Sequence, residues 1–216
     1  MSNGFGRDAR AFEAQQSALA MLSSAQRYRD PFTCKHEDRT AELAAAIAAR
    51  MGLPPARIEI LRLAATVHDI GKIGVPTEIV GKAGKLSDPE YALMKTHSVI
   101  GHEILRHLRS PFPFAEIALQ HHERLDGSGY PQALSGDAIL LEARILAVAD
   151  VCDAMTSHRA YRAALPRDFV LAELHGMSGR TLDANAVAAC TAHVLAHPVA
   201  ESRGRVVTAT SEPICS

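Results

Sequence analysis

The stretch that decides the fold is LRLAATVHDIGKIGVP, residues 61–76. Apolar residues recur at helical spacing through its first half, and His68 falls on the same apolar face, which predicts a helix that ends at His68 and Asp69. Glycines then break the helix and a proline closes the turn. A buried imidazole beside a carboxylate is costly unless something pairs with both groups, and a metal ion is one such partner. Lys72 follows in the turn, where its ammonium group could reach an anion held by the metal.

The other histidines decide between a metal site and an ordinary helix end, because a single HD dipeptide is more often the latter. The chain has 11 histidines, and His68, His97 and His121 fall on the apolar faces of three different expected helices. One such histidine is usually a core residue with a local partner. Several on separate helices would need several independent partners, whereas one shared metal cluster supplies them all.

The candidate ligands are five histidines and two aspartates, which are too many for one cation and suit two six-coordinate ions that share a carboxylate. Zinc prefers a smaller, tetrahedral set, so two divalent ions of iron or manganese fit this set better. The seven residues are His36, His68, Asp69, His97, His121, His122 and Asp150.

Length and composition predict one compact domain with short extensions. The chain has 216 residues, 47% of them apolar, and a formal net charge of −1, so nothing indicates binding to a DNA or RNA polymer or to a membrane surface. Four scattered cysteines without a CxxC pair indicate free thiols in a reducing compartment. No apolar run approaches a membrane span and no signal peptide is recognisable, which together predict a cytoplasmic protein.

The periodicity predicts an all-α fold, because no alternating strand pattern and no internal repeat is found. Two long glycine-rich loops, residues 71–86 and 127–136, interrupt the helices. The expected helices cover residues 11–28, 33–51, 54–69, 88–108, 114–122, 140–157, 167–177 and 183–196.

Three parts of the chain are expected to differ in role. Residues 31–197 would form the catalytic domain. Residues 1–30 would form an N-terminal arm and helix, with the arm over residues 1–10. Residues 198–216, rich in threonine, serine and proline, would form a disordered tail.

Three blocks of sequence resemble the HD-GYP domain, a family of cyclic di-GMP hydrolases among the HD phosphohydrolases. The blocks are HDIGKIGVP at residues 68–76, HHERLDGSGYP at 121–131 and ARILAVADVCDAMTSHRAYR at 143–162. They follow the family order H…HD…H…HH…D, and the resemblance covers residues 36–196. It implies a compact multi-helix HD-domain bundle with a metal cluster in its core and both glycine-rich loops over the site.

The resemblance also implies how the candidate residues divide their roles. One metal would be held by His36, His68, Asp69 and Asp150. The second, bridged to the first by Asp69, would be held by Asp69, His97, His121 and His122. Asp69 and Lys72 would be catalytic. The substrate would be contacted by Lys72, Gly129, Tyr130, Arg159 and Arg162.

The implied reaction is hydrolysis of cyclic di-GMP by attack of a hydroxide that bridges the two metals. Linear pGpG is the expected product, with further cleavage to GMP left open. Implied partners are a diguanylate cyclase with a GGDEF domain, or a receiver or sensor protein. Two alternatives remain open: an HD-superfamily hydrolase of another nucleotide, and a non-catalytic receptor or adaptor for cyclic di-GMP that docks diguanylate cyclases.

The chain departs from the family pattern at four positions. Phe32 stands where some members have a glutamate linked to a third metal, four residues before His36, so we expect two metals rather than three. Cys34 replaces the glycine of the usual DPxTG stretch. Ala160 replaces the proline of RPYR, and Ala133 replaces a glycine, both on the side of the ligand rather than of the metals.

Overall fold

The computed structural model describes residues 4–29, 31–108, 110–157 and 163–197. Within these ranges all regular structure is helical, which confirms the all-α expectation. No helix in this part of the chain is both long and apolar enough to cross a membrane. The elements are α1 (Gly4–Arg29), α2 (Pro31–Arg50), α3 (Pro55–Ala65), η1 (Ile70–Gly74), α4 (Thr77–Val80), α5 (Asp88–Leu105), η2 (Arg106–Leu108), α6 (Phe114–Gln120), η3 (Gly136–Ala138), α7 (Leu141–Thr156), α8 (Arg167–Met177) and α9 (Ala184–Ala196).

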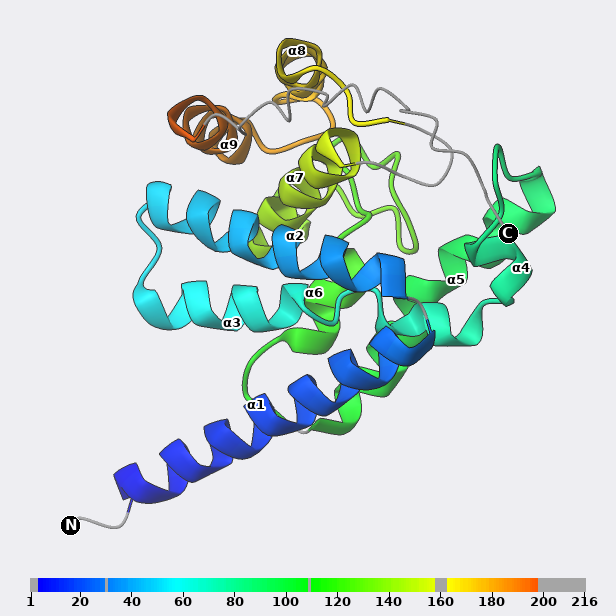
Figure 1. The fold of residues 1–216 in the computed structure, drawn as a ribbon. Coiled ribbons are helices and arrows are strands. Elements are labelled where there is room, and N and C mark those ends of the chain that lie inside the picture. The colour runs from blue at the N-terminus through cyan, green and yellow to red at the C-terminus, as the bar shows by residue number, and fades with distance from the viewer. Residues whose placement is uncertain (1–3, 30, 109, 158–162, 198–216) are drawn as a thin grey trace, which may run out of the picture.

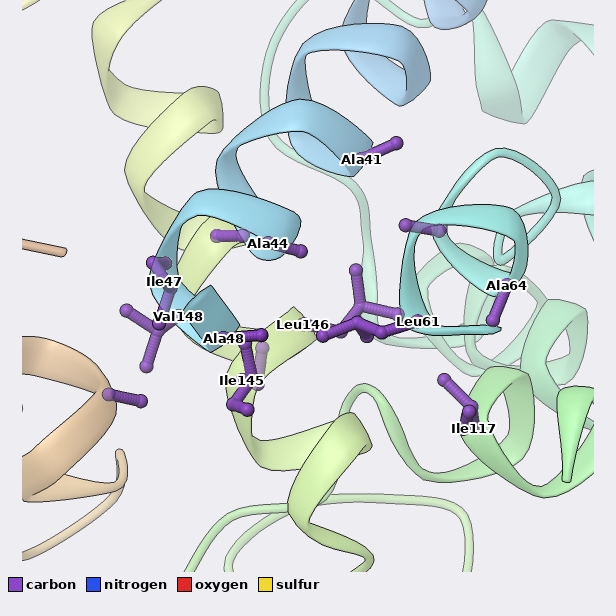
Figure 2. Packing of buried hydrophobic residues seen from close by; sticks show 14 of the residues in the cluster. Ala41, Ala44, Ile47, Ala48, Leu61, Ala64, Ile117, Ile145, Leu146 and Val148 are labelled. Carbon is purple, nitrogen blue, oxygen red and sulfur yellow. The ribbon is translucent and has the colours of Figure 1, made fainter. Parts of the chain in front are cut away.

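The hydrophobic core lies where α2, α3, α6 and α7 meet. Figure 1 shows α2 beside α3, with α8 and α9 together at the top of the view. Ala44 and Ala48 of α2 are fully buried, and such small side chains let neighbouring helices approach closely. Leu61, Ile117 and Leu146 fill the space between α3, α6 and α7 (Figure 2). These are the helices that carry or precede most of the candidate ligands, so the packing of the core sets where those ligands lie.

Helix α1 begins at Gly4, and the expectation of a loose arm over residues 1–10 is therefore wrong for residues 4–10. This segment contains a single large apolar residue, Phe5, so a pattern of buried apolar residues could not reveal a helix there. Farther along, Arg27 pairs with both carboxylate oxygens of Asp38 at 2.6 and 2.9 Å, which joins α1 to α2.

Two helices end earlier than expected, and both ends carry candidate ligands. Helix α3 ends at Ala65 rather than at Asp69, so His68 and Asp69 lie in the following turn. Helix α6 ends at Gln120, just before His121. The last carbonyl groups of a helix have no partner within the helix, and in both places a ligand histidine makes use of one, as shown below.

The first glycine-rich loop is more ordered than expected, because it contains η1 and α4. Gly71 in η1 packs directly on α5. A Cβ atom at this position would overlap the carbonyl oxygen of His97 and the amide nitrogen of Gly101. Only glycine fits such a close backbone approach, and this contact brings the turn that holds Asp69 against the helix that holds His97.

We expect Gly71→Ala to lower the free energy of unfolding by about 3 kcal/mol or more, because the added methyl group must push η1 and α5 apart. Gly176→Ala is the matched control, since a Cβ atom there would meet nothing within 4 Å, and alanine within a helix is neutral or stabilising by up to about 1 kcal/mol. Denaturant unfolding measures both variants. A Gly71→Ala protein as stable as the control would contradict the close packing of η1 on α5.

Two further expectations concern the cysteines and the C-terminal tail. Cys152 and Cys190 are buried free thiols, in agreement with the expected reduced cysteines. The tail over residues 198–216 lies outside the described residues.

Candidate metal centre

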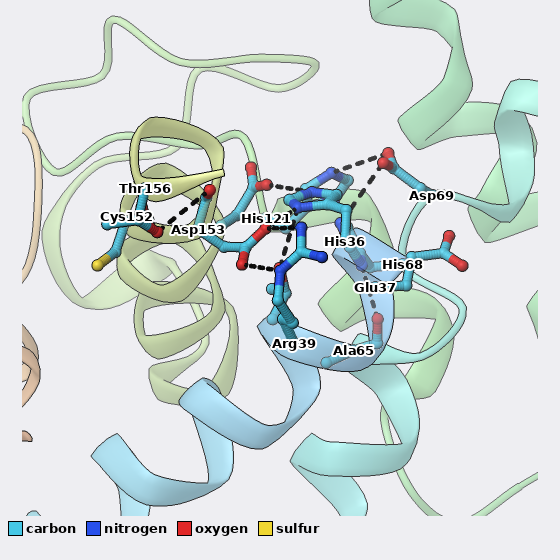
Figure 3. Close-up of polar contacts among 12 residues, drawn as sticks. His36, Glu37, Arg39, Ala65, His68, Asp69, His121, Cys152, Asp153 and Thr156 are labelled. Carbon is cyan, nitrogen blue, oxygen red and sulfur yellow. Dashed lines mark hydrogen bonds and ion pairs between the residues drawn. The ribbon is translucent and has the colours of Figure 1, made fainter. Parts of the chain in front are cut away.

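Histidine and aspartate side chains from α2, α5 and the turns that follow α3 and α6 converge in the fold. Within the described ranges, two groups have all their ligand atoms within 4.8 Å of one another. One group consists of Asp69, His97, His121 and His122, and the other of His36, His68 and Asp69. Asp69 belongs to both groups, so its carboxylate lies between two sets of imidazoles. In Figure 3 the imidazoles of His36, His68 and His121 lie between Asp69 on one side and Asp153 on the other.

The same local bond orients three of these imidazoles. The Nδ1 atoms of His68, His97 and His121 lie 2.7, 2.7 and 2.6 Å from the carbonyl oxygen three residues earlier. A carbonyl oxygen only accepts hydrogen bonds, so each Nδ1 carries the proton and each Nε2 keeps its lone pair. All three rings therefore present Nε2 as a ligand atom, and backbone carbonyls are common partners for the outer nitrogen of a metal-bound histidine.

These ligand atoms meet around a buried carboxylate oxygen. Nε2 of His97 lies 3.3 Å from Nε2 of His121. Oδ1 of Asp69 lies 3.3 Å from the first of these nitrogens and 3.9 Å from the second. No hydrogen bond reaches this oxygen from any described residue. Three electron-rich atoms that face one another in a buried site repel unless a cation lies among them, so the residues present fit a divalent metal.

The protonation states agree with a ligand role. Burial lowers the pKa of His97 and of His121, and it lowers the pKa of His122 to about 3, so these imidazoles are neutral and available to a metal. Burial alone would raise the pKa of Asp69, but the positive charge of Lys72 holds it well below its usual value. Around Asp69 the site thus combines neutral imidazoles with an ionised carboxylate.

His36 lies between two aspartates of α7. Its Nε2 atom is 3.0 Å from Oδ1 of Asp150, and its Nδ1 atom is 2.6 Å from Oδ2 of Asp153. Burial lowers the pKa of His36, but these two carboxylates outweigh that effect and raise it to about 9. A proton on Nε2 therefore supplies a positive charge beside Asp150, and a metal held by this imidazole would have to displace that proton.

The sequence reasoning missed the residues that hold His36 in place. Asp153 accepts the Nδ1–H of His36 and is itself bound by Arg39, at 2.6 Å from Nε to Oδ1 and 2.9 Å from Nη2 to Oδ2. Both lie three residues after a candidate ligand, Asp153 after Asp150 and Arg39 after His36. That i, i+3 spacing on a helix was the signal that could have found them.

Two further ionisable side chains, Lys72 and Glu37, lie near the imidazoles. The ammonium group of Lys72 pairs with Oδ2 of Asp69, and the side chain of Lys72 keeps 23% of its surface exposed. Glu37, which the sequence reasoning also missed, is buried, and its Oε1 accepts a 2.5 Å hydrogen bond from Nε2 of Gln26 in α1. Burial raises the pKa of Glu37 to about 8. Helix α1 therefore contacts the residue that follows the first candidate ligand.

The second glycine-rich loop folds back onto His122. A Cβ atom on Gly129 would lie 2.5 Å from the backbone of residues 122–124, so the loop can approach this closely only with glycine there. The ring of Tyr130 then lies 4.7 Å from the ring of His122. Glu123, a buried residue that the sequence reasoning did not single out, accepts hydrogen bonds of 2.7 and 3.0 Å from two backbone amides of residues 132–134.

We expect Glu123→Gln to loosen this loop, because an amide side chain cannot accept at both positions and leaves polar groups unpaired, at a cost of about 1–3 kcal/mol. The Michaelis constant for a substrate that contacts Tyr130 should rise, while the metal content stays at its wild-type value. The exposed Glu116 supplies the matched control, Glu116→Gln. Equal Michaelis constants in the two variants would contradict a role for Glu123 in holding the loop.

Some of the predicted roles fall on residues outside the described ranges. Arg159, Ala160 and Arg162 lie outside the described residues, and so does the side chain of Phe32. The phosphate clamp expected from the two arginines and the count of two metals rather than three therefore stay predictions.

Comparison with known proteins identifies the family. The model of the HD domain family matches residues 20–186. The cyclic di-GMP phosphodiesterase response regulator RpfG of Xanthomonas campestris pv. campestris (strain 8004) is 44% identical over 177 residues, which make up 81% of this chain and 47% of that protein. A cyclic di-GMP phosphodiesterase of Thermotoga maritima is 42% identical over 164 residues, or 75% of this chain and 45% of the relative. The chain spans about half the length of these curated relatives.

Solved structures have the same fold. Bd1817, an HDG"Y"P protein from Bdellovibrio bacteriovorus, matches with a TM-score of 0.65 at 19% identity, over 85% of this chain and 62% of that chain. The cyclic GMP-AMP-specific phosphodiesterase V-cGAP3 of Vibrio cholerae matches with a TM-score of 0.55 at 30% identity, over 83% of this chain and 41% of that chain. The chain belongs to the HD domain family and, with both an HD and a GYP segment in its sequence, to the HD-GYP proteins within it.

Proposed function

We propose that this chain is a metal-dependent phosphodiesterase that hydrolyses cyclic di-GMP to linear pGpG. The observation that carries the proposal is the buried Oδ1 atom of Asp69, which has lone pairs of two imidazoles beside it and no hydrogen bond from the described residues. Relatives at 44% and 42% identity are named cyclic di-GMP phosphodiesterases, which supports the choice of substrate.

The proposed cofactors are two divalent ions, iron or manganese, because the ligand set mixes imidazole with carboxylate and contains no thiolate. Bound there, such ions supply a water of lowered pKa as the nucleophile and neutralise charge on the phosphoryl oxygens. Asp69 would be shared between the ions. The first ion would be held by His36, His68, Asp69 and Asp150, and the second by Asp69, His97, His121 and His122.

The side chains around the centre would bind and orient the phosphodiester. Lys72 is held by Asp69 yet remains partly exposed, so its ammonium group can meet a phosphate oxygen or the leaving group where negative charge grows in the transition state. The partly buried ring of Tyr130 forms one wall of the site beside His122. Arg159 and Arg162 are proposed to clamp phosphates, as the resemblance implies.

We also propose a cytoplasmic location and a protein partner, either a GGDEF-containing diguanylate cyclase or a receiver or sensor protein. Cyclic di-GMP signalling brings synthesis and hydrolysis of one nucleotide under common control, and these partners would supply the regulatory input. A pull-down with the isolated chain against purified cyclase and receiver domains tests the partner proposal.

The second candidate substrate is 3'3'-cGAMP, which one comparison supports. A relative named 3'3'-cGAMP-specific phosphodiesterase 3, from Vibrio cholerae, is 43% identical over 145 residues, or 67% of this chain and 31% of that protein. Cyclic di-GMP and 3'3'-cGAMP differ in one nucleobase and have the same phosphodiester ring, so the metal centre described above could act on either.

Anaerobic turnover of cyclic di-GMP by the Fe(II)- or Mn(II)-loaded protein tests the proposed function. Parallel reactions contain 3'3'-cGAMP and cyclic di-AMP, and chromatography separates pGpG from GMP. Faster hydrolysis of cyclic di-GMP than of the other two supports the proposal. Faster hydrolysis of 3'3'-cGAMP would select the second substrate. Tight binding of cyclic di-GMP without turnover would instead indicate a receptor.

A further inference from the structure

A second tyrosine lies beside Tyr130 at the outer edge of the candidate metal centre. Tyr91, near the start of α5, is 48% exposed. Its ring centroid lies 6.4 Å from that of Tyr130, with the two rings nearly perpendicular at 84°. Because the ring of Tyr130 packs on His122 at 4.7 Å, the three rings form a row that leads from a candidate metal ligand to the surface.

A lysine lies next to both tyrosines. Nζ of Lys95, one helical turn after Tyr91, is 5.2 Å from the ring centroid of Tyr91 and 5.8 Å from that of Tyr130. Cations at such distances from aromatic rings are attracted to the ring faces, so Lys95 helps to hold both rings in place. Its distance to the ring of Tyr130, which packs on His122, places this cation near the outer edge of the centre.

The arrangement suits a ligand that joins a phosphodiester to flat aromatic groups. When a phosphodiester of a cyclic dinucleotide is bound at the metal centre, its nucleobases must extend away from that centre along the surrounding walls. Tyr91 offers a half-exposed ring at the end of such a wall, with a positive charge beside it. An aromatic ring in a positively charged site is the general means by which proteins bind unpaired bases.

We propose that Tyr91 is a stacking surface for one nucleobase of the substrate, and that Lys95 orients this ring and adds positive charge near the ligand. The inference deepens the proposed function and rests on it. Stacking on an aromatic ring accepts any base, so Tyr91 contributes to affinity for cyclic dinucleotides in general and does not distinguish guanine from adenine.

Substitution of Tyr91 tests the inference by steady-state kinetics. Tyr91→Ala is expected to raise the Michaelis constant for cyclic di-GMP about tenfold, the usual size of one base-stacking contact, and to change kcat far less. The same factor is expected for 3'3'-cGAMP. Tyr91→Phe keeps the ring and should retain most of the affinity. Leu93→Ala is the matched control, because Leu93 lies on the same helix and is also 48% exposed.

A fluorescence measurement reads stacking directly. The chain contains no tryptophan, so Tyr91→Trp introduces a single indole at the proposed position and Leu93→Trp introduces one two residues away. Stopped-flow mixing with cyclic di-GMP records binding before hydrolysis. A stacked guanine is expected to quench the fluorescence of the Tyr91→Trp protein and to leave that of the Leu93→Trp protein unchanged.

The outcomes separate this inference from the proposed function. If the metal-loaded wild-type protein binds and hydrolyses cyclic di-GMP, but Tyr91→Ala has an unchanged Michaelis constant or the indole is not quenched, the inference is wrong and the proposed function stands. If the wild-type protein neither binds nor hydrolyses any cyclic dinucleotide, the proposed function fails and the inference fails with it.

Discussion

Replacing Asp69 by alanine is expected to abolish both metal binding and turnover. The carboxylate of Asp69 belongs to both groups of candidate ligand atoms, so its removal would take one ligand from each proposed metal and leave imidazoles that repel one another. Metal content should fall from about two ions per chain to less than one, and hydrolysis should fall at least about a thousandfold. Elemental analysis after anaerobic loading, followed by the cyclic di-GMP assay, measures both quantities.

Two further variants make this result interpretable. Asp69→Asn keeps the shape of the side chain but loses its charge, so it should also lose metal if the carboxylate is needed as a ligand. Asp137→Ala removes an aspartate whose side chain is 98% exposed, and it should behave as the wild-type protein does. A folded Asp69→Ala protein with full metal content and full activity would contradict the ligand role of Asp69.

Replacing Lys72 by methionine is expected to separate metal binding from catalysis. No metal ligand is lost, so the metal content should stay near that of the wild-type protein. The ammonium group that meets charge growing in the transition state is lost, and removal of one such group typically lowers kcat about a hundredfold to a thousandfold. The exposed Lys85 provides the matched control, Lys85→Met.

The Lys72→Met variant should also show a stability effect that depends on metal. Lys72 pairs with the buried carboxylate of Asp69, and breaking a buried pair costs about 3 kcal/mol or more. A bound cation would replace the lost partner, so added Mn(II) should raise the melting temperature of Lys72→Met more than that of the wild-type protein. An equal rise in the two proteins would argue against a metal beside Asp69.

The sequence was most informative about the ligands, for a physical reason. His68, His97 and His121 are buried, and the helical period of the apolar residues that precede them indicated this burial, although His68 and His121 lie just past the ends of α3 and α6. The pairs His68-Asp69 and His121-His122 could therefore be recognised as candidate ligands from the sequence alone. The structure brings these residues together as the resemblance implied.

The remaining features depend on contacts that no local pattern records. His68 and His121 bind carbonyl groups in the last turns of α3 and α6. Hydrophobic periodicity does not record these bonds, so it predicted helix ends that are a few residues too late. Glu37 and Glu123 are buried acidic residues whose partners lie in another helix or in a returning loop. Tyr91 gains its position beside Tyr130 only when α5 meets the second glycine-rich loop.

The most direct test of the metal centre is the number of metal ions bound per chain after anaerobic loading with Mn(II) and removal of the excess. The convergence of the imidazoles on Asp69 predicts about two ions per wild-type chain, together with protection of the fold against heat that a chelator reverses. A protein that is folded, binds no metal at all and melts at the same temperature with and without Mn(II) would contradict the assignment of this cluster as a metal centre.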